Sequence, residues 1–133
     1  MFVDASAIVA MIAGEPEAEH LAISLEASER RTTSAIAVLE TVMAIRRLNG
    51  CSVSEAEALV TGFLSEADVT VIPVGAREGR AAVEAYARFG KGQGHPARLN
   101  LADCFAYACA RTNDVPLLFV GSDFSQTDIP PAA

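Results

Sequence analysis

The first 14 residues, Met-Phe-Val-Asp-Ala-Ser-Ala-Ile-Val-Ala-Met-Ile-Ala-Gly, combine a strand and a helix. Phe2-Val3 is an apolar pair typical of a short buried strand. The apolar run from Ala5 to Ala13 predicts a helix, and Gly14 ends it because glycine readily adopts the conformation that closes a helix. Asp4 lies at the junction. The chain therefore opens with a strand that turns directly into a helix.

The rest of the chain repeats this alternation, which indicates a parallel sheet between helical layers. We predict a three-layer α/β/α fold with a short central parallel sheet, in a single domain spanning residues 1–133. The glycine-rich stretch 90–96 cannot hold regular structure, and the proline-rich tail, about residues 129–133, is expected to fray. Further helices are expected from Pro16 to about Arg30, from Ala35 to Leu48, from Ser52 or Ser54 to about Ala67, from Ala76 to Phe89 and from Leu101 to Thr112, with strands at 32–34, 69–73 and 117–120.

Composition favours one compact domain: the chain has 133 residues, of which 51% are hydrophobic. No apolar run approaches the roughly 20 residues of a membrane span, and the start lacks the basic segment of a signal peptide. The three cysteines, Cys51, Cys104 and Cys109, form no CxxC pair, which argues against structural zinc. They predict reduced thiols in a cytoplasmic protein.

The net charge of −7 argues against loose, non-specific nucleic-acid binding, which needs many cationic contacts. It does not exclude a nuclease, because a site built from several carboxylates contributes much of that negative charge itself.

Four acidic residues are candidates for a common site: Asp4, Glu40, Asp103 and Asp123. Asp4 and Asp123 follow apolar strand candidates, and sites of open α/β sheets form at the carboxyl ends of strands. Glu40 and Asp103 lie on helices among apolar neighbours. Carboxylates are hard oxygen ligands for divalent ions, which activate water and stabilise the leaving oxygen in phosphodiester cleavage. The pattern therefore predicts a metal-dependent enzyme acting on phosphodiesters.

Each acid also has a plainer explanation. Asp4 could cap the helix that follows it, and Asp123 could be a turn residue after Gly121. Glu40 could lie on a solvated helix edge, and Asp103 could interact only with its helix dipole. The joint occurrence of the four in one small chain favours the shared site.

Five further residues are secondary candidates. Ser6 and Thr127 could orient carboxylates or bind metal-linked water in an outer shell, or could serve as cap and turn residues. His95 is interpreted as a loop histidine with a packing or substrate-contact role rather than a general base. Lys91 and Arg98 flank the glycine-rich stretch and could contact RNA phosphates or lie on plain surface.

Four segments resemble the acidic motifs of PIN-domain proteins, in the order found in that family and over nearly the whole chain. The likeness is closest to the VapC toxins of bacterial toxin–antitoxin pairs. Two positions depart from the pattern of many relatives, namely Ser122 in place of an acid or asparagine and Ala102 in place of glycine. The four segments are Phe2-Val3-Asp4-Ala5-Ser6-Ala7, Leu39-Glu40-Thr41, Gly94 to Ala108, and Pro116 to Phe124 with Thr127-Asp128-Ile129.

The resemblance implies an endoribonuclease that uses Mg2+ or Mn2+. By motif match its ligand-forming acids are Asp4, Glu40, Asp103 and Asp123, with Asp128 as a possible assistant. It further implies an RNA substrate and a VapB-like antitoxin partner, and we also expect a homodimer. A crowded carboxylate cleft suits an arginine of such a partner, because one guanidinium binds two oxygens.

Two alternatives from other classes stay open. One is another metal-dependent phosphohydrolase on a similar sheet, although a phosphatase with an aspartyl nucleophile usually carries an aspartate where this chain has Ser6. The other is a catalytically silent PIN-fold module for protein interaction.

Overall fold

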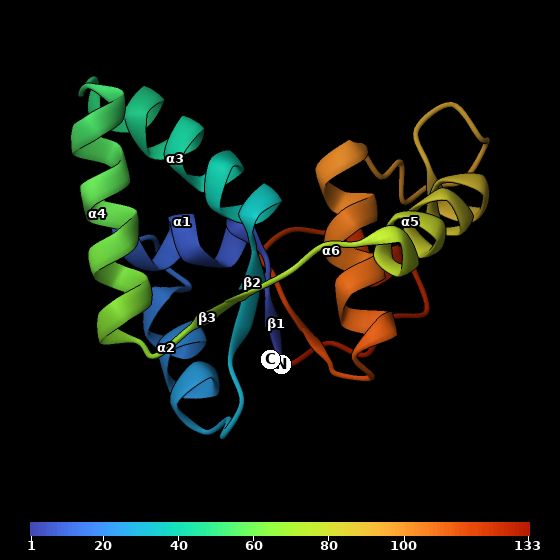
Figure 1. Cartoon of the computed structure of the whole chain (residues 1–133), viewed down its shortest axis with the longest axis horizontal. Helices are drawn as coiled ribbons and strands as arrows, with labels where there is room; N and C mark the ends of the chain where they lie inside the picture. Colours follow the sequence, from blue (N-terminus) through green and yellow to red (C-terminus); the bar gives the residue numbers. More distant parts are fainter.

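The computed structural model describes all 133 residues and is built around a parallel sheet. The strand order is β3-β2-β1-β4, and every neighbouring pair is parallel. Figure 1 shows the short sheet between two groups of helices. The expected parallel sheet is therefore confirmed. Its strands are β1 (Phe2–Val3), β2 (Thr32–Ser34), β3 (Thr70–Ile72) and β4 (Leu117–Leu118).

Alternation along the neighbouring strands β1 and β4 divides the core into two halves. Phe2 and Leu117 are paired and belong to the core beneath α5 (Ala76–Phe89) and α6 (Leu101–Thr112). Val3 and Leu118 are the next pair and belong to the core on the opposite face. Because successive strand residues face opposite ways, two residues per strand suffice to anchor both layers. The three-layer α/β/α architecture is confirmed.

Four helices cover the second face, and local caps mark the ends of α3 and the start of α4. The last residue of β2, Ser34, also caps α3: its Oγ accepts the N–H of Ala37 at 3.2 Å. Gly50 ends α3 with a φ of 62°, and Ser52 caps α4. None of the six helices has the length and apolar character of a membrane span. The four helices of this layer are α1 (Ala5–Ala13), α2 (Ala18–Glu26), α3 (Ala35–Asn49) and α4 (Val53–Glu66).

The second helix is shorter than expected: α2 runs only from Ala18 to Glu26, not from Pro16 to Arg30. Its end is fixed by Arg31, whose guanidinium donates to the carbonyls of Glu26, Ser28 and Ala67. Since Ala67 follows α4, this side chain ties the ends of two helices together. The strand β3 is also trimmed, to Thr70–Ile72.

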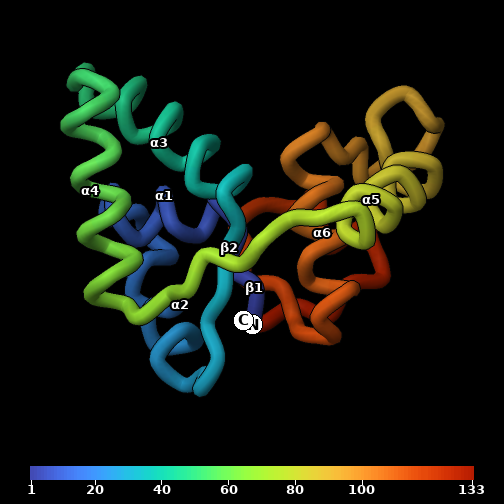
Figure 2. Tube along the Cα trace, viewed as in Figure 1, coloured from blue at the N-terminus to red at the C-terminus, as the bar shows by residue number.

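The prediction that the C-terminal tail frays is wrong. Leu117 donates its N–H to Pro130 and accepts the N–H of Ala132, both at 2.9 Å, and Ile129 is buried. Proline cannot donate, but its carbonyl can accept from the edge strand. The tail thus extends the sheet beside β4, so β4 lies between the C-terminal tail and β1, and the tube in Figure 2 shows the tail returning to the sheet.

The glycine-rich stretch forms turns, as expected, and backbone hydrogen bonds join its two ends. Leu99 donates its N–H to the carbonyl of Phe89, and Lys91 donates to Leu99, both at 2.9 Å. The loop is therefore anchored between α5 and α6.

Candidate active site

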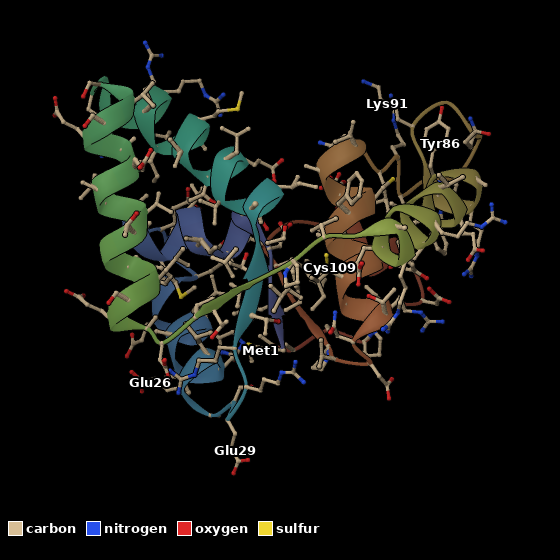
Figure 3. All side chains as sticks on the ribbon, in the orientation of Figure 1. Met1, Glu26, Glu29, Tyr86, Lys91 and Cys109 are labelled. Atoms are coloured by element: carbon tan, nitrogen blue, oxygen red, sulfur yellow. The ribbon has the colours of Figure 1, made fainter.

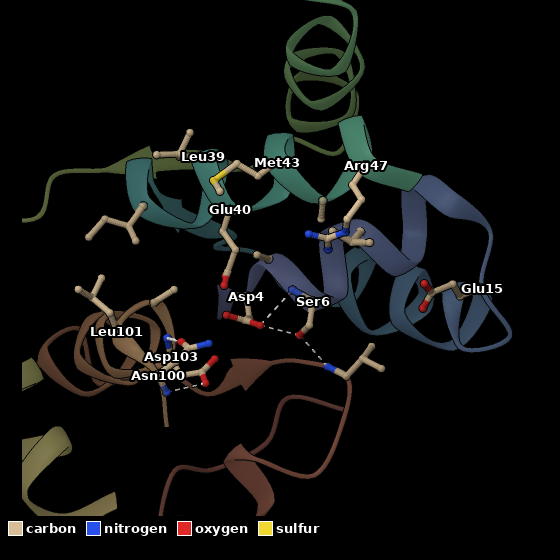
Figure 4. A pocket seen from close by; sticks show the side chains of 16 residues that line it. Asp4, Ser6, Glu15, Leu39, Glu40, Met43, Arg47, Asn100, Leu101 and Asp103 are labelled. Atoms are coloured by element: carbon tan, nitrogen blue, oxygen red, sulfur yellow. Dashed lines mark hydrogen bonds between the residues drawn. The ribbon is translucent and has the colours of Figure 1, made fainter. Parts of the chain in front are cut away.

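A cleft of about 720 Å³ opens at the carboxyl end of β1, between α3 and the beginnings of α1 and α6. Three of the four predicted acids, Asp4, Glu40 and Asp103, line it. Glu40 extends from α3 toward Asp4, and Asp103 faces them from α6 (Figure 4). Residues from three distant parts of the sequence are thus brought together at the edge where α/β sheets form their sites.

Asp4 is almost fully buried and uses only one of its two carboxylate oxygens. Its Oδ2 accepts the N–H of Ser6 at 3.0 Å and the Ser6 hydroxyl at 2.5 Å. Its Oδ1 is buried and has no hydrogen-bond partner. Helix capping therefore explains one oxygen and leaves the other unsatisfied. Burial raises the pKa of the Asp4 carboxyl, against the lowering effect of the Ser6 bonds.

Ser6 connects Asp4 to the neighbouring strand. Its Oγ donates to Asp4 and accepts the N–H of Val120 at 3.0 Å. The N–H of Val120 thus bonds to Ser6 and not to a neighbouring strand. The strand β4 accordingly ends at Leu118, whereas the sequence predicted an end at Val120. The expectation that Ser6 orients a carboxylate agrees with these contacts.

Glu40 lies on the helix face predicted from its spacing, and the residues sharing that face line the cleft, namely Ile36, Met43, Ala44 and Arg47. The side chain is half-buried. Burial, followed by the nearby charges of Asp4 and Asp103, raises the pKa of Glu40 to about 7. The carboxylates thus repel one another in a partly dry cleft.

Asp103 combines a structural and a site position. With Asn100 it forms a capping box at the start of α6: its Oδ2 accepts the Asn100 N–H at 3.0 Å, and Asn100 Oδ1 accepts the Asp103 N–H at 2.8 Å. Burial, and then the charges of Asp4 and Asp123, raise the pKa of Asp103 to about 6. Asp103 therefore has a structural role at the start of its helix and lines the cleft as well, so the explanation by the helix dipole alone is not sufficient.

Asp123 lies at the margin of the cluster. It is exposed, precedes the short 3-10 helix η1 (Phe124–Gln126) and does not line the cleft. Its charge still acts on Asp4 and Asp103. No three acidic, histidine or cysteine side chains converge closely enough in this structure to hold one ion. The structure thus brings three predicted acids into one cleft, with the fourth beside it, but does not draw them around a single point.

Thr127 belongs to a turn. Its Oγ1 donates to the carbonyl of Phe124 at 2.7 Å and accepts the N–H of Ile129 at 3.2 Å. The Thr127 hydroxyl thus both donates and accepts within its own turn, which agrees with the turn explanation.

The structure also corrects the expectation that Asp128 assists the acids. Its Oδ1 accepts the hydroxyl of Tyr107, and its Oδ2 accepts Nη2 of Arg88 at 3.1 Å, with Nη2 of Arg111 at 3.9 Å. These contacts, which we term the tail clasp, fasten the C-terminal segment to α5 and α6. The reason is electrostatic, because two arginines attract this carboxylate away from a cleft that is already acidic.

His95 has the packing role expected of it. Its Nδ1 accepts the N–H of Ala97 at 3.1 Å, and its ring meets Phe89 edge-on with centroids 4.9 Å apart. Lys91 and Arg98 are exposed and do not line the cleft; Lys91 stands on the loop after α5 (Figure 3). Their contact with RNA remains a prediction.

Two charged cleft residues, Glu15 and Arg47, were not assigned a role from sequence. The position of Arg47 seven residues after Glu40 places both on one face of α3. That helical spacing was the signal that could have identified it.

Comparison with known proteins agrees with this geometry. Residues 1–130 match the PIN domain family. Ribonuclease VapC42 of Mycobacterium tuberculosis is 42% identical over 132 residues, covering 99% of this chain and 98% of that protein. A VapC ribonuclease of Rhizobium meliloti is 38% identical, covering 96% and 98%. The chain therefore belongs to the PIN-domain family and groups within it with the VapC ribonucleases.

A solved structure supports the same fold. VapC20 of Mycobacterium tuberculosis, described as a toxin that cleaves the sarcin–ricin loop, superposes with a TM-score of 0.71 over 96% of this chain and 95% of that one. At 22% identity this likeness concerns the fold alone.

Proposed function

We propose that this protein is an endoribonuclease toxin that depends on Mg2+ or Mn2+ bound at the acid cleft. The observation that carries the proposal is the buried Oδ1 of Asp4, which has no partner and lies in a cleft with Glu40 and Asp103. A buried carboxylate oxygen without a partner is unfavourable. A divalent cation would satisfy it and would relieve the repulsion among the three acids.

The donor set fits a hard cation. Asp4, Glu40 and Asp103 offer only oxygens, which Mg2+ and Mn2+ prefer, and Asp123 is close enough to add its charge. When bound, the ion would supply Lewis-acid stabilisation of charge at the phosphate. The chain's own part is to hold the ligands: the Ser6 hydroxyl donates to the Asp4 carboxylate, and the Asn100 N–H donates to the Asp103 carboxylate.

Substitution of the ligands tests the proposal. Asp4→Asn and Asp103→Asn should each lower RNA cleavage at least about 100-fold, because a ligand to the catalytic ion is lost. Mn2+ binding, measured by calorimetry, should weaken in the same variants, and a chelator should abolish cleavage by the wild type. The matched control is Asp114→Asn, an exposed aspartate whose φ of 52° asparagine tolerates.

Two results would contradict the proposal. Cleavage that survives in both variants would exclude these acids as ligands. A wild type that binds no Mn2+ and cleaves no RNA would favour the silent interaction module.

We also propose a VapB-like antitoxin as partner, with an arginine entering the acid cleft. The observed cleft is acidic, partly buried and open to a guanidinium, which can bind two carboxylate oxygens at once. Expression of the chain alone should arrest growth, and co-expression with its VapB-like antitoxin should relieve the arrest. A lone protein that cleaves RNA yet leaves growth unchanged would refute the toxin assignment.

A homodimer and a cytoplasmic location complete the proposal. Ile23 of α2 and Leu59 of α4 are 60% and 47% exposed, so both helices leave apolar surface free for a second copy of the chain. The three cysteines are unpaired, which suits a reducing compartment. Sedimentation of the purified protein decides between monomer and dimer.

A further inference from the structure

Two arginines lie along the acid cleft and form no ion pair, although Glu15 also lines the cleft. Arg47 lines the cleft itself, and Arg46 lines an adjoining hollow beside Gly50. The two hollows share Met43 and Arg47, so they are continuous along α3. Both arginines are exposed, and the ion pairs of the chain involve other residues. Two guanidinium groups are thus free to bind a ligand.

Their position along α3 gives the direction of a path. Arg47 follows Glu40 by seven residues, which is two helical turns or about 10 Å along the axis. Figure 4 shows both side chains on the cleft side of α3. Arg46 points about 100° around the helix from Arg47, toward the adjoining hollow. A cationic path therefore leads from the acids past Met43 to the end of α3.

The charge of this path matches one class of ligand. The chain carries a net charge of −7, and four acids line the cleft, namely Asp4, Glu15, Glu40 and Asp103. A polyanion needs cations beside such a cluster, and a guanidinium binds phosphate through two parallel hydrogen bonds. The exposed Met43 between them offers a flexible apolar surface to a base.

A structural explanation for the arginines also exists. Cations in the last turn of a helix interact favourably with its dipole, and both arginines lie near the end of α3. That effect does not depend on which side of the helix a residue occupies, whereas Arg47 lies on the cleft side. The two explanations differ in one respect: only binding to the substrate would make RNA cleavage depend on these arginines.

We propose that Arg47 and then Arg46 bind consecutive phosphates of single-stranded RNA on one side of the scissile bond. The inference rests on the proposed function and extends it by assigning the path of the substrate. The inference predicts that nucleotides on this side of the scissile bond increase the affinity for RNA, because Arg46 and Arg47 bind their phosphates.

The test compares two double variants that remove equal charge. Arg46→Gln/Arg47→Gln changes the proposed path, and Arg77→Gln/Arg80→Gln removes two exposed arginines from α5 in the opposite layer. One cleaved sequence is selected from a random pool of single-stranded RNA with Mg2+, and kcat/KM is measured over a range of salt. The first variant should lose about 10-fold, mainly through KM, and its salt slope should flatten by about 1.4, or roughly 0.7 per phosphate. The second should keep the wild-type slope.

A trimming series makes the test independent of stability. The selected RNA is shortened one nucleotide at a time from each end. The wild type should lose kcat/KM when one end is trimmed, and the Arg46→Gln/Arg47→Gln variant should be insensitive to the same trimming. Arg46→Lys/Arg47→Lys keeps the charge at the helix end and should behave in between, and it carries the test if the glutamine variant does not fold.

Two outcomes would overturn the inference alone. They are equal sensitivity of wild type and variant to trimming, and equal salt slopes in the two double variants. A wild type that cleaves no RNA in the pool would instead overturn the proposed function, and the inference with it.

Discussion

At the scale of single residues, the candidate site depends on one serine and one aspartate. The Ser6 hydroxyl donates to Asp4 and accepts the N–H of Val120. It therefore holds the first acid and connects it to the segment that leads from β4 to Asp123. The Oδ1 of Asp4 is left buried without a partner. This combination of one fixed oxygen and one unsatisfied oxygen distinguishes Asp4 from an ordinary helix cap.

Ser6→Ala should lower the free energy of unfolding by about 1–3 kcal/mol, because the partly buried N–H of Val120 and Oδ2 of Asp4 each lose a partner. Urea unfolding measures the change. The control is Ser54→Ala, an exposed serine early in α4. Equal stability of the two variants would mean that the Ser6 hydroxyl has no structural role.

Residue-level prediction from sequence succeeded where the signal was local. Glu40 and its face on α3 follow from helical spacing, and the structure places that face in the cleft. Asp128 is the counterexample. Its partners Tyr107 and Arg88 are 21 and 40 residues away, and no pattern in the neighbouring sequence could indicate them.

At the scale of elements, helix boundaries were predictable when their caps were local. The helices at 76–89 and 101–112 have the expected bounds, since Gly75 and Asn100 are recognisable beginnings. The end of α2 was missed because it is fixed by Arg31, which reaches Ala67 at the far end of α4. The end of β4 was missed for a similar reason, because Val120 bonds to Ser6 of α1.

Arg31→Met should lower the free energy of unfolding by about 1–3 kcal/mol, because three carbonyls at helix ends lose their charged donor. Thermal or urea unfolding measures the change. Arg30→Met is the matched control, since the Arg30 side chain is exposed and makes no such bond. If the two variants unfold alike, the contacts of Arg31 contribute nothing to stability.

At the scale of the whole molecule, the C-terminal segment closes the fold. The tail pairs with Leu117, and the tail clasp fastens it to α5 and α6. The alternation of strands and helices predicted the layers, but this closure depends on contacts between segments far apart in the chain. Composition alone suggested a loose, proline-rich end.

Asp128→Asn should lower the free energy of unfolding by about 0.5–1.5 kcal/mol, because the charge-assisted bond to Arg88 is weakened at a partly exposed site. Mn2+ affinity and RNA cleavage should stay at wild-type values below the melting temperature. A loss of Mn2+ binding as large as that of Asp103→Asn would return Asp128 to the metal site.

The central claim is that Asp4, Glu40 and Asp103 form one cation site. Anomalous diffraction from crystals soaked in Mn2+ tests it most directly, because it locates the ion without reference to activity. We predict a peak within bonding distance of Asp4 Oδ1, with oxygens of Asp103 or Glu40 completing the set. Mn2+ bound only elsewhere, or no peak in crystals of protein that cleaves RNA, would contradict the claim.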